Sequence, residues 1–184
     1  MRWPVFLVAA FIVLVLQFSL RDVLTLRSIG SISPDFVASL AVFVGLFAPR
    51  STALWACWLL GLAMDLGPPA GAMKWHLIGP HALGYVFGGY LVLQMRAMVF
   101  RRRALTAAFL TCLFLIASGV LATFLLTVRS WYLDDTPLYH APLSELWQRI
   151  KIAVYSGVVG WPCGWLVVIT IRMWNFAGRA WGRA

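Results

Sequence analysis

Two acids beside apolar segments are the residues with the clearest scope for chemistry in this sequence. Asp35 opens one segment and Asp65 closes the next, just before Gly67-Pro68-Pro69, where a helix must stop because proline has no amide hydrogen. If both segments cross a membrane, the two carboxylates lie at the edge of the hydrocarbon on the same side. An acid in that position is costly and tends to have an assigned partner. Asp35 and Asp65 are therefore the first candidate functional residues.

Asp35 has a simple structural interpretation. Ser33 is expected to cap the helix that follows, and Pro34 suits its first position. Asp35 would then lie in the first turn, where the helix dipole stabilises a negative charge. These residue types at this spacing predict a helix start.

Asp65 is less easily placed, because it falls in the last turn of its helix, where the dipole opposes a negative charge. It is either an interfacial acid exposed to water or a carboxylate with a specific partner. The candidate partners are the loop amides of residues 70–74, Lys74 and His81. We favour a specific partner, because an unpaired acid at the membrane edge is costly.

The other polar residues form no pattern typical of a catalytic or metal site. The sequence has no HExxH, GxSxG or P-loop motif and no paired carboxylates on a central helical face. The histidines His76, His81 and His140 are too scattered for a zinc site, and the three cysteines have no CxxC spacing. We therefore expect a protein that is not an enzyme and has neither cofactor nor metal.

The composition is that of an integral membrane protein. Of the 184 residues, 62% are hydrophobic and 11% are charged, and the mean hydropathy is +0.86. The formal net charge is +9. Because the basic residues lie between apolar runs, the positive-inside rule explains them better than nucleic-acid binding does.

The apolar runs predict an all-α integral membrane protein, a single transmembrane domain over residues 1–184 with about six helices. The expected spans are 3–20, 34–49, 51–66, 79–96, 104–128 and 151–172. The second and third spans are near the lower limit of about 17 residues for crossing a bilayer. Gly88-Gly89 should let a neighbouring helix approach closely, and Pro162 should bend the last helix.

Six spans put both termini on one side, and the basic residues favour the cytoplasm for that side. With this orientation, nine of the 15 Lys and Arg residues lie inside, four of them in the short segment 96–103. That segment is a topological anchor or an anionic-lipid site. If the second and third spans were a re-entrant pair, the orientation of the others would not change.

The loop before the last span contains one apolar helical face. Its residues recur at the spacing of successive helical turns: Leu143, Leu146, Trp147 and Ile150. Pro142 suits the start of this helix, which we expect to continue into the last span. The face either lies on the membrane surface or receives a partner helix.

Four motifs resemble those of the MreD family, bacterial rod shape-determining membrane proteins. They are Pro34-Asp35 at the second span, Gly61-Leu62-Ala63-Met64-Asp65-Leu66 at the end of the third, Gly79-Pro80-His81-Ala82-Leu83 with Tyr90 in the fourth, and Pro162 after Gly157 and Gly160 in the last. The sequence departs from the family pattern in a longer loop, 67–78, and near Ser156-Gly157, where an asparagine is expected.

The resemblance implies a non-enzymatic scaffold of the cell-wall elongation machinery in the bacterial inner membrane. The implied partners are the bitopic protein MreC, with RodA, its class B transpeptidase, MreB and membrane lipids as further candidates, and no nucleic acid. The structural or partner-binding residues that the resemblance implies are Pro34, Asp35, Gly61, Asp65, Gly79, Tyr90 and Pro162, and the apolar face adds Trp147.

Two other functions remain open from the sequence. A substrate-binding subunit of a vitamin-type transporter has a similar size and helix number. Such subunits resemble one another in a small-xxx-small pattern on the first helix, which Ala9 with Val13 and Ala10 with Leu14 do not supply. A lipid-modifying enzyme would need a nucleophile–base pair, which the sequence does not offer.

Overall fold

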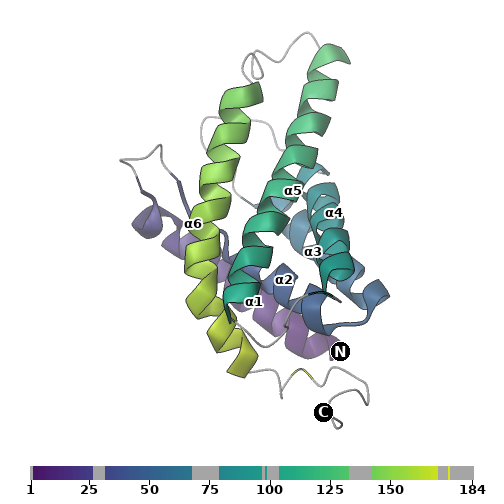
Figure 1. Ribbon diagram of the computed structural model, residues 1–184, viewed down its shortest axis with the longest axis vertical. Helices are drawn as coiled ribbons and strands as arrows, with labels where there is room; N and C mark the ends of the chain where they lie inside the picture. The colour runs from purple at the N-terminus through teal and green to yellow at the C-terminus, as the bar shows by residue number, and fades with distance from the viewer. Residues whose placement is uncertain are drawn as a thin grey trace.

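The computed structural model describes residues 2–26, 32–67, 79–96, 98, 104–132, 142–169 and 174. This part of the chain is all-helical and contains no sheet, as expected (Figure 1). Its helices are α1 (Trp3–Leu24), α2 (Phe36–Phe47), α3 (Arg50–Leu66), α4 (Pro80–Met95), α5 (Ala104–Tyr132) and α6 (Pro142–Ile169). Within α1 and α5, the segments Trp3–Arg21 and Leu105–Val128 are long and apolar enough to cross a membrane. The full bundle of six membrane spans stays a prediction.

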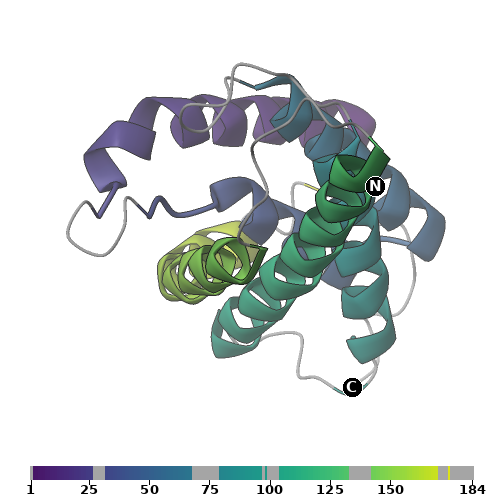
Figure 2. The same cartoon turned by 90° about the horizontal axis from the view of Figure 1, so that it is seen from above.

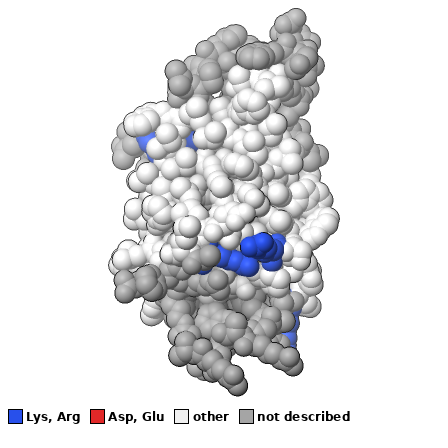
Figure 3. All heavy atoms as spheres, turned by 45° about the vertical axis from the view of Figure 1, so that its right-hand side comes forward, with Lys and Arg blue, Asp and Glu red and all other residues white. Residues whose placement is uncertain are grey.

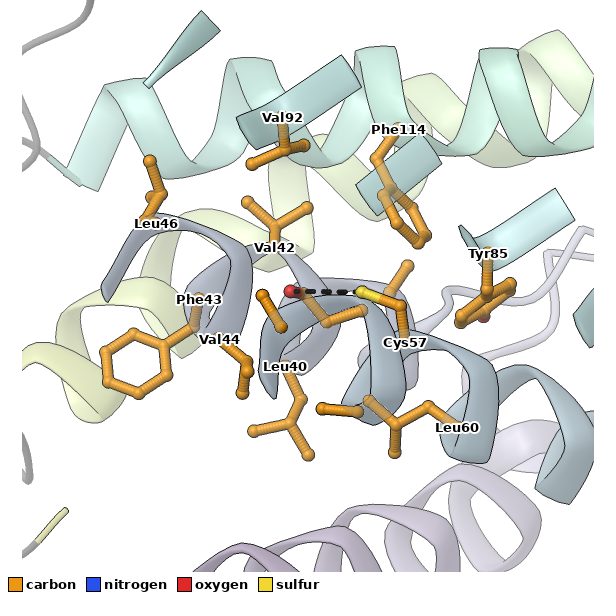
Figure 4. Packing of buried hydrophobic residues seen from close by; sticks show 14 of the residues in the cluster. Leu40, Val42, Phe43, Val44, Leu46, Cys57, Leu60, Tyr85, Val92 and Phe114 are labelled. Carbon is orange, nitrogen blue, oxygen red and sulfur yellow. Dashed lines mark hydrogen bonds between the residues drawn. The ribbon is translucent and has the colours of Figure 1, made fainter. Parts of the chain in front are cut away.

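Helix α2 is the centre of the packing. Nine of its 12 residues are buried, and it contacts each of the other five helices of the described chain. A helix that is hydrophobic all round is expected to be enclosed by its neighbours. In Figure 4, Val42 of α2 lies near Val92 of α4, and the Cys57 thiol of α3 faces the carbonyl oxygen of Ala41 at 4.0 Å.

Helix α4 fits closely between α3 and α5 because glycines line both contacts. A Cβ atom added to Gly84 would lie 2.8 Å from the carbonyl oxygen of Ser118 in α5. One added to Gly89 would lie 2.7 Å from the sulfur of Cys57 in α3. The close approach predicted at Gly88-Gly89 is confirmed, since Gly88 likewise faces Phe114 of α5.

Helices α5 and α6 form a long antiparallel pair that extends beyond the others (Figure 1). The 29 residues of α5 correspond to about 43 Å. The 16 residues of α4 correspond to about 24 Å. Helix α1 lies along one side of the bundle, against α2 (Figure 2), and most of its apolar surface is exposed.

The first and last described residues lie together. The backbone N–H of Arg2 donates to the carbonyl oxygen of Trp174 at 3.3 Å. The Trp174 ring packs edge-on against Phe43 of α2, with ring centroids 5.3 Å apart. An even number of membrane crossings requires the two ends to lie on the same side, and this contact fits that requirement. The cytoplasmic location of this end stays a prediction from the basic residues.

Two helix starts differ from or extend the sequence expectations. Helix α2 begins at Phe36 with Asp35 as its N-cap, so the predictions of Ser33 as the cap, Pro34 at the first helical position and Asp35 in the first turn were wrong. The physical reason is that the Asp35 carboxylate, and not the Ser33 hydroxyl, reaches a first-turn amide. Helix α6 runs unbroken from Pro142 to Ile169 and contains Pro162, so the predicted continuation of the outer helix into the last span is confirmed.

Candidate functional site

The Asp65 carboxylate lies at the junction of α3 and α4, and its side chain is 0% exposed. Its Oδ2 accepts hydrogen bonds from the backbone amides of Gly79 at 2.8 Å and Ala82 at 3.1 Å. Its Oδ1 accepts one from the amide of His81 at 3.2 Å, and the His81 ring Nδ1 lies 2.8 Å from the same oxygen. The carboxylate therefore caps the first turn of α4, whose amides have no partner within the helix.

This geometry explains why an acid stands where the dipole of its own helix opposes it. The C-terminus of α3 repels a negative charge, but the N-terminus of α4 attracts one, and Asp65 meets both. Hydrogen bonds to an ionised carboxylate are roughly twice as strong as neutral ones. Of the predicted partners, His81 is the one the structure brings to Asp65, while Lys74 and residues 70–74 lie outside the described residues.

Two glycines allow α4 to reach this carboxylate. Gly79, the N-cap of α4, has a φ of 131°, a conformation that residues with a side chain rarely adopt. A Cβ atom on Gly61 of α3 would lie 2.7 Å from the Cα of Ala82. Gly61, Asp65 and Gly79 thus meet at one helix junction, although they come from two sequence motifs.

Asp35 forms a second junction near the same end of α4. Its Oδ1 accepts from the amide of Ala38 at 2.9 Å, which caps α2, and its Oδ2 accepts from the hydroxyl of Tyr85 in α4 at 2.7 Å. Its backbone N–H donates to the Oγ of Ser156 in α6 at 2.9 Å. Tyr85 is 2% exposed. One residue therefore joins α2, α4 and α6.

The same helix start is also tied to α1 through Gln17. The Gln17 Nε2 donates to the carbonyl oxygen of Pro34 at 3.0 Å, and its Oε1 accepts from the amide of Phe36 at 2.8 Å. A buried side-chain amide that both donates and accepts satisfies backbone groups that cannot reach water. Pro34 is thereby fixed between α1 and α2. We call the end of the bundle that contains Asp35 and Asp65 the acid end.

The opposite end of α4 is held by an arginine. The Nη1 of Arg96, which follows α4, donates to the carbonyl oxygen of Ala48 at the end of α2 at 2.9 Å. We call this end, which also contains Arg2 and Arg50, the arginine end. The hairpin of α2 and α3 is thus bound to α4 at both of its ends, by acids at one and by an arginine at the other.

Three of the predicted residues lie apart from these junctions. Tyr90 is 50% exposed and accepts from the Nε2 of Gln94 at 2.8 Å, so it does not contact either acid. Trp147 is 62% exposed on α6, and Pro162 lies inside α6 on an exposed position.

Sequence reasoning missed Gln17, Tyr85 and Ser156. Gln17 is a lone amide within an apolar run, and Ser156 stands near the position where the family pattern has asparagine. Tyr85 lies closer than Tyr90 to the start of its helix, which is the end where the acids lie.

The junctions have the properties of structural clamps. Both carboxylates accept hydrogen bonds from fixed donors. Asp65 joins the consecutive helices α3 and α4, and Asp35 joins α2 to α4 and α6, which are farther away in the sequence. Among the described residues, no three His, Cys, Asp or Glu side chains gather closely enough to hold a metal ion. This chemistry positions α4 against α2 and α3, and it ties the start of α2 to α6.

Comparison with known proteins finds a family model that matches most of the chain. A family model described as rod shape-determining protein MreD matches residues 1–155, most of the 184-residue chain. The match includes every residue of the two acid junctions except Ser156. No curated protein and no solved structure matches.

Proposed function

The chain belongs to the MreD family of rod shape-determining membrane proteins, and from this premise we propose that it is a non-enzymatic scaffold of the bacterial cell-wall elongation machinery that binds an MreC-like partner. The observation that carries the proposal is the family match over residues 1–155. We further propose six membrane spans in the inner membrane, with both termini in the cytoplasm.

The hydrogen bonds of the buried polar groups support a scaffold. Asp35 and Asp65 hold helix ends in place, as polar groups inside a membrane protein must be satisfied internally. A helix bundle fixed at both ends of α4 presents a constant outer surface to a partner. Constant geometry lowers the entropy that binding would otherwise cost.

The distribution of charge supports the membrane-embedded arrangement. On the face drawn in Figure 3, the described Lys and Arg side chains form separate groups with a broad uncharged zone between them, and no acid is visible. The described positions of Arg2, Arg50 and Arg96 at one end fit the cytoplasmic side of the positive-inside rule.

We propose the outer part of α6 as the partner surface. Trp147 and Ile150 are exposed there, and Leu146 is partly exposed. Leu143 also belongs to α6, but its side chain lies outside the described part. Because α6 is one continuous helix alongside α5, this segment is not a separate helix that could lie flat on the membrane. An exposed face with this spacing suits a partner helix.

The test is copurification of an MreC-like protein with the variant Trp147→Ala. The matched control is Trp165→Ala, because Trp147 and Trp165 are both 62% exposed on α6 and lie toward opposite ends of the helix. We expect Trp147→Ala to reduce the partner several-fold at unchanged membrane abundance and Trp165→Ala to leave it near the wild-type amount. Copurification of the partner at the wild-type amount with both variants would mean that Trp147 is a lipid contact and not a partner contact.

A further inference from the structure

Helix α4 lies against only part of the length of α5. Gly84 of α4 faces Ser118 of α5. One turn further along α4, Gly88 faces Phe114, four residues earlier in α5. In this antiparallel register the first residue of α4 lies level with about residue 122 of α5. The apolar segment of α5 continues to Val128, about 9 Å further. Apolar surface of α5 therefore extends past the acid end of α4, as Figure 1 also shows for the helices themselves.

The exposed side chains at this level differ between the two sides of the bundle. On the α4 side, the imidazole of His81 is 42% exposed in the first turn of the helix. On α5, Val120 is 50% exposed and Phe124 is 61% exposed. Val120 follows Ser118 by two residues, which is about 200° around the helix, so it lies on the face turned away from α4. Polar surface on one side and apolar surface on the other thus share one level.

Helices α3 and α4 are shorter than the hydrocarbon core of an ordinary bilayer. The 16 residues of α4 correspond to about 24 Å and the 17 residues of α3 to about 26 Å, whereas the core is about 30 Å thick. Tilting would shorten the distance that they span. Sliding one helix along the other is prevented, because Asp65 binds the amides of Gly79 and Ala82 and so fixes the end of α3 to the start of α4. A bilayer can accommodate such a short pair by becoming thinner beside it.

We propose that the bilayer is thinned along α3 and α4, so that the lipid headgroups at the acid end lie about 6 Å deeper there than along α5. The lipids that fit this side are phospholipids with short acyl chains. The exposed imidazole of His81 then lies at headgroup level and not in the hydrocarbon, where a polar group is costly. The proposal rests on the proposed membrane crossing of α3, α4 and α5 and does not depend on the MreC-like partner.

Nitroxide labels at two matched positions test this shape directly. Leu83 of α4 and Val120 of α5 are 51% and 50% exposed, and the register of the two helices places them at nearly the same level. The variants Leu83→Cys and Val120→Cys are labelled in a full chain whose native cysteines are replaced by alanine, and they are reconstituted in phosphatidylcholine bilayers. Collisions of each label with oxygen and with a water-soluble nickel complex give its depth. We expect the label of Leu83→Cys to lie about 6 Å nearer the headgroups than that of Val120→Cys.

Equal depths of the two labels would overturn the proposal, because the bilayer would then be equally thick on both sides. A third label, at the exposed Gln94 near the other end of α4, distinguishes this result from a failure of the proposed topology. Ascorbate should reduce the labels of Leu83→Cys and Gln94→Cys from opposite sides of sealed vesicles. Reduction of both labels from the same side would mean that α4 does not cross, and would overturn the proposed crossing together with the thinning.

The wild-type chain supplies a second measurement that involves no substitution. Dimyristoleoylphosphatidylcholine and dierucoylphosphatidylcholine have the same headgroup and differ in the length of their acyl chains. Each competes with a brominated phosphatidylcholine that quenches the fluorescence of exposed tryptophans such as Trp55 of α3. The short-chain lipid should bind several-fold more tightly, because its bilayer is closer in thickness to α3 and α4. Equal binding of the two lipids, or tighter binding of the long-chain lipid, would overturn the proposal.

Discussion

Replacing Asp65 by asparagine removes the charge from the clamp on α4 while keeping the shape of the side chain. The best arrangement leaves the amide oxygen facing Gly79 and Ala82, which keeps both of those hydrogen bonds. The new NH2 group then faces His81, where the ring can accept from it in the other tautomer but the His81 amide loses its acceptor. The loss is one charge-assisted hydrogen bond and the weakening of two others, about 1.5–3 kcal/mol.

A loss of this size should not unfold the chain, because a domain is typically stable by about 5–15 kcal/mol. We therefore expect the variant to insert and accumulate, with only the first turn of α4 opening more often. Hydrogen exchange of the amides of Gly79, His81, Ala82 and Leu83 should accelerate about tenfold to hundredfold, since 1.4 kcal/mol corresponds to a factor of ten. Cleavage by trypsin at Lys74 should also become faster.

The amides in the middle of α5 serve as the internal control and should exchange at the wild-type rate. Faster exchange throughout the chain would mean global destabilisation instead of a local clamp. Wild-type exchange at residues 79–83 would refute the reasoning, because Asp65 would then hold α4 without using its charge.

Two further predictions follow from the same contacts. Tyr85→Phe leaves the buried Asp35 carboxylate without its phenol donor and should lower the free energy of unfolding by about 1–3 kcal/mol. Tyr90→Phe is the control at an exposed position and should change the free energy of unfolding by less than about 0.5 kcal/mol. Equal effects of the two variants would contradict the assignment of Tyr85 as the partner of Asp35. For the orientation, a cysteine replacing Arg101 should resist membrane-impermeant thiol reagents in intact cells while one replacing Asp134 reacts, and the reverse labelling pattern would place the termini outside.

The helices and the special position of Asp65 could be predicted from sequence because both follow from local rules. Apolar runs between basic residues mark the helices, and an acid at a helix C-terminus needs a compensating partner. The start of α4 supplies that partner. The close approach at Gly88-Gly89 was likewise predicted, since a missing side chain at such a position is informative whatever lies opposite it. Gly61 was named only through the family resemblance, and its contact with α4 came from the structure.

The residues that surround Asp35 could not be predicted, because they depend on the tertiary arrangement of four helices. Gln17, Tyr85 and Ser156 come from three different helices, and no spacing in the sequence links them. The choice between Tyr85 and Tyr90 could have been made from helix geometry. Tyr90 lies ten residues into α4, about 15 Å from its start, too far from an acid at that end.

The most direct test of the proposed scaffold role is purification of the tagged wild-type chain in mild detergent from a rod-shaped bacterium that depends on it for shape. The copurifying proteins are quantified by mass spectrometry against an unrelated tagged membrane protein of similar abundance. The proposed function predicts that an MreC-like bitopic protein is enriched at a near-constant ratio to the chain while the cells remain rods. Rod-shaped cells from which the chain purifies without any enrichment of such a protein would contradict it.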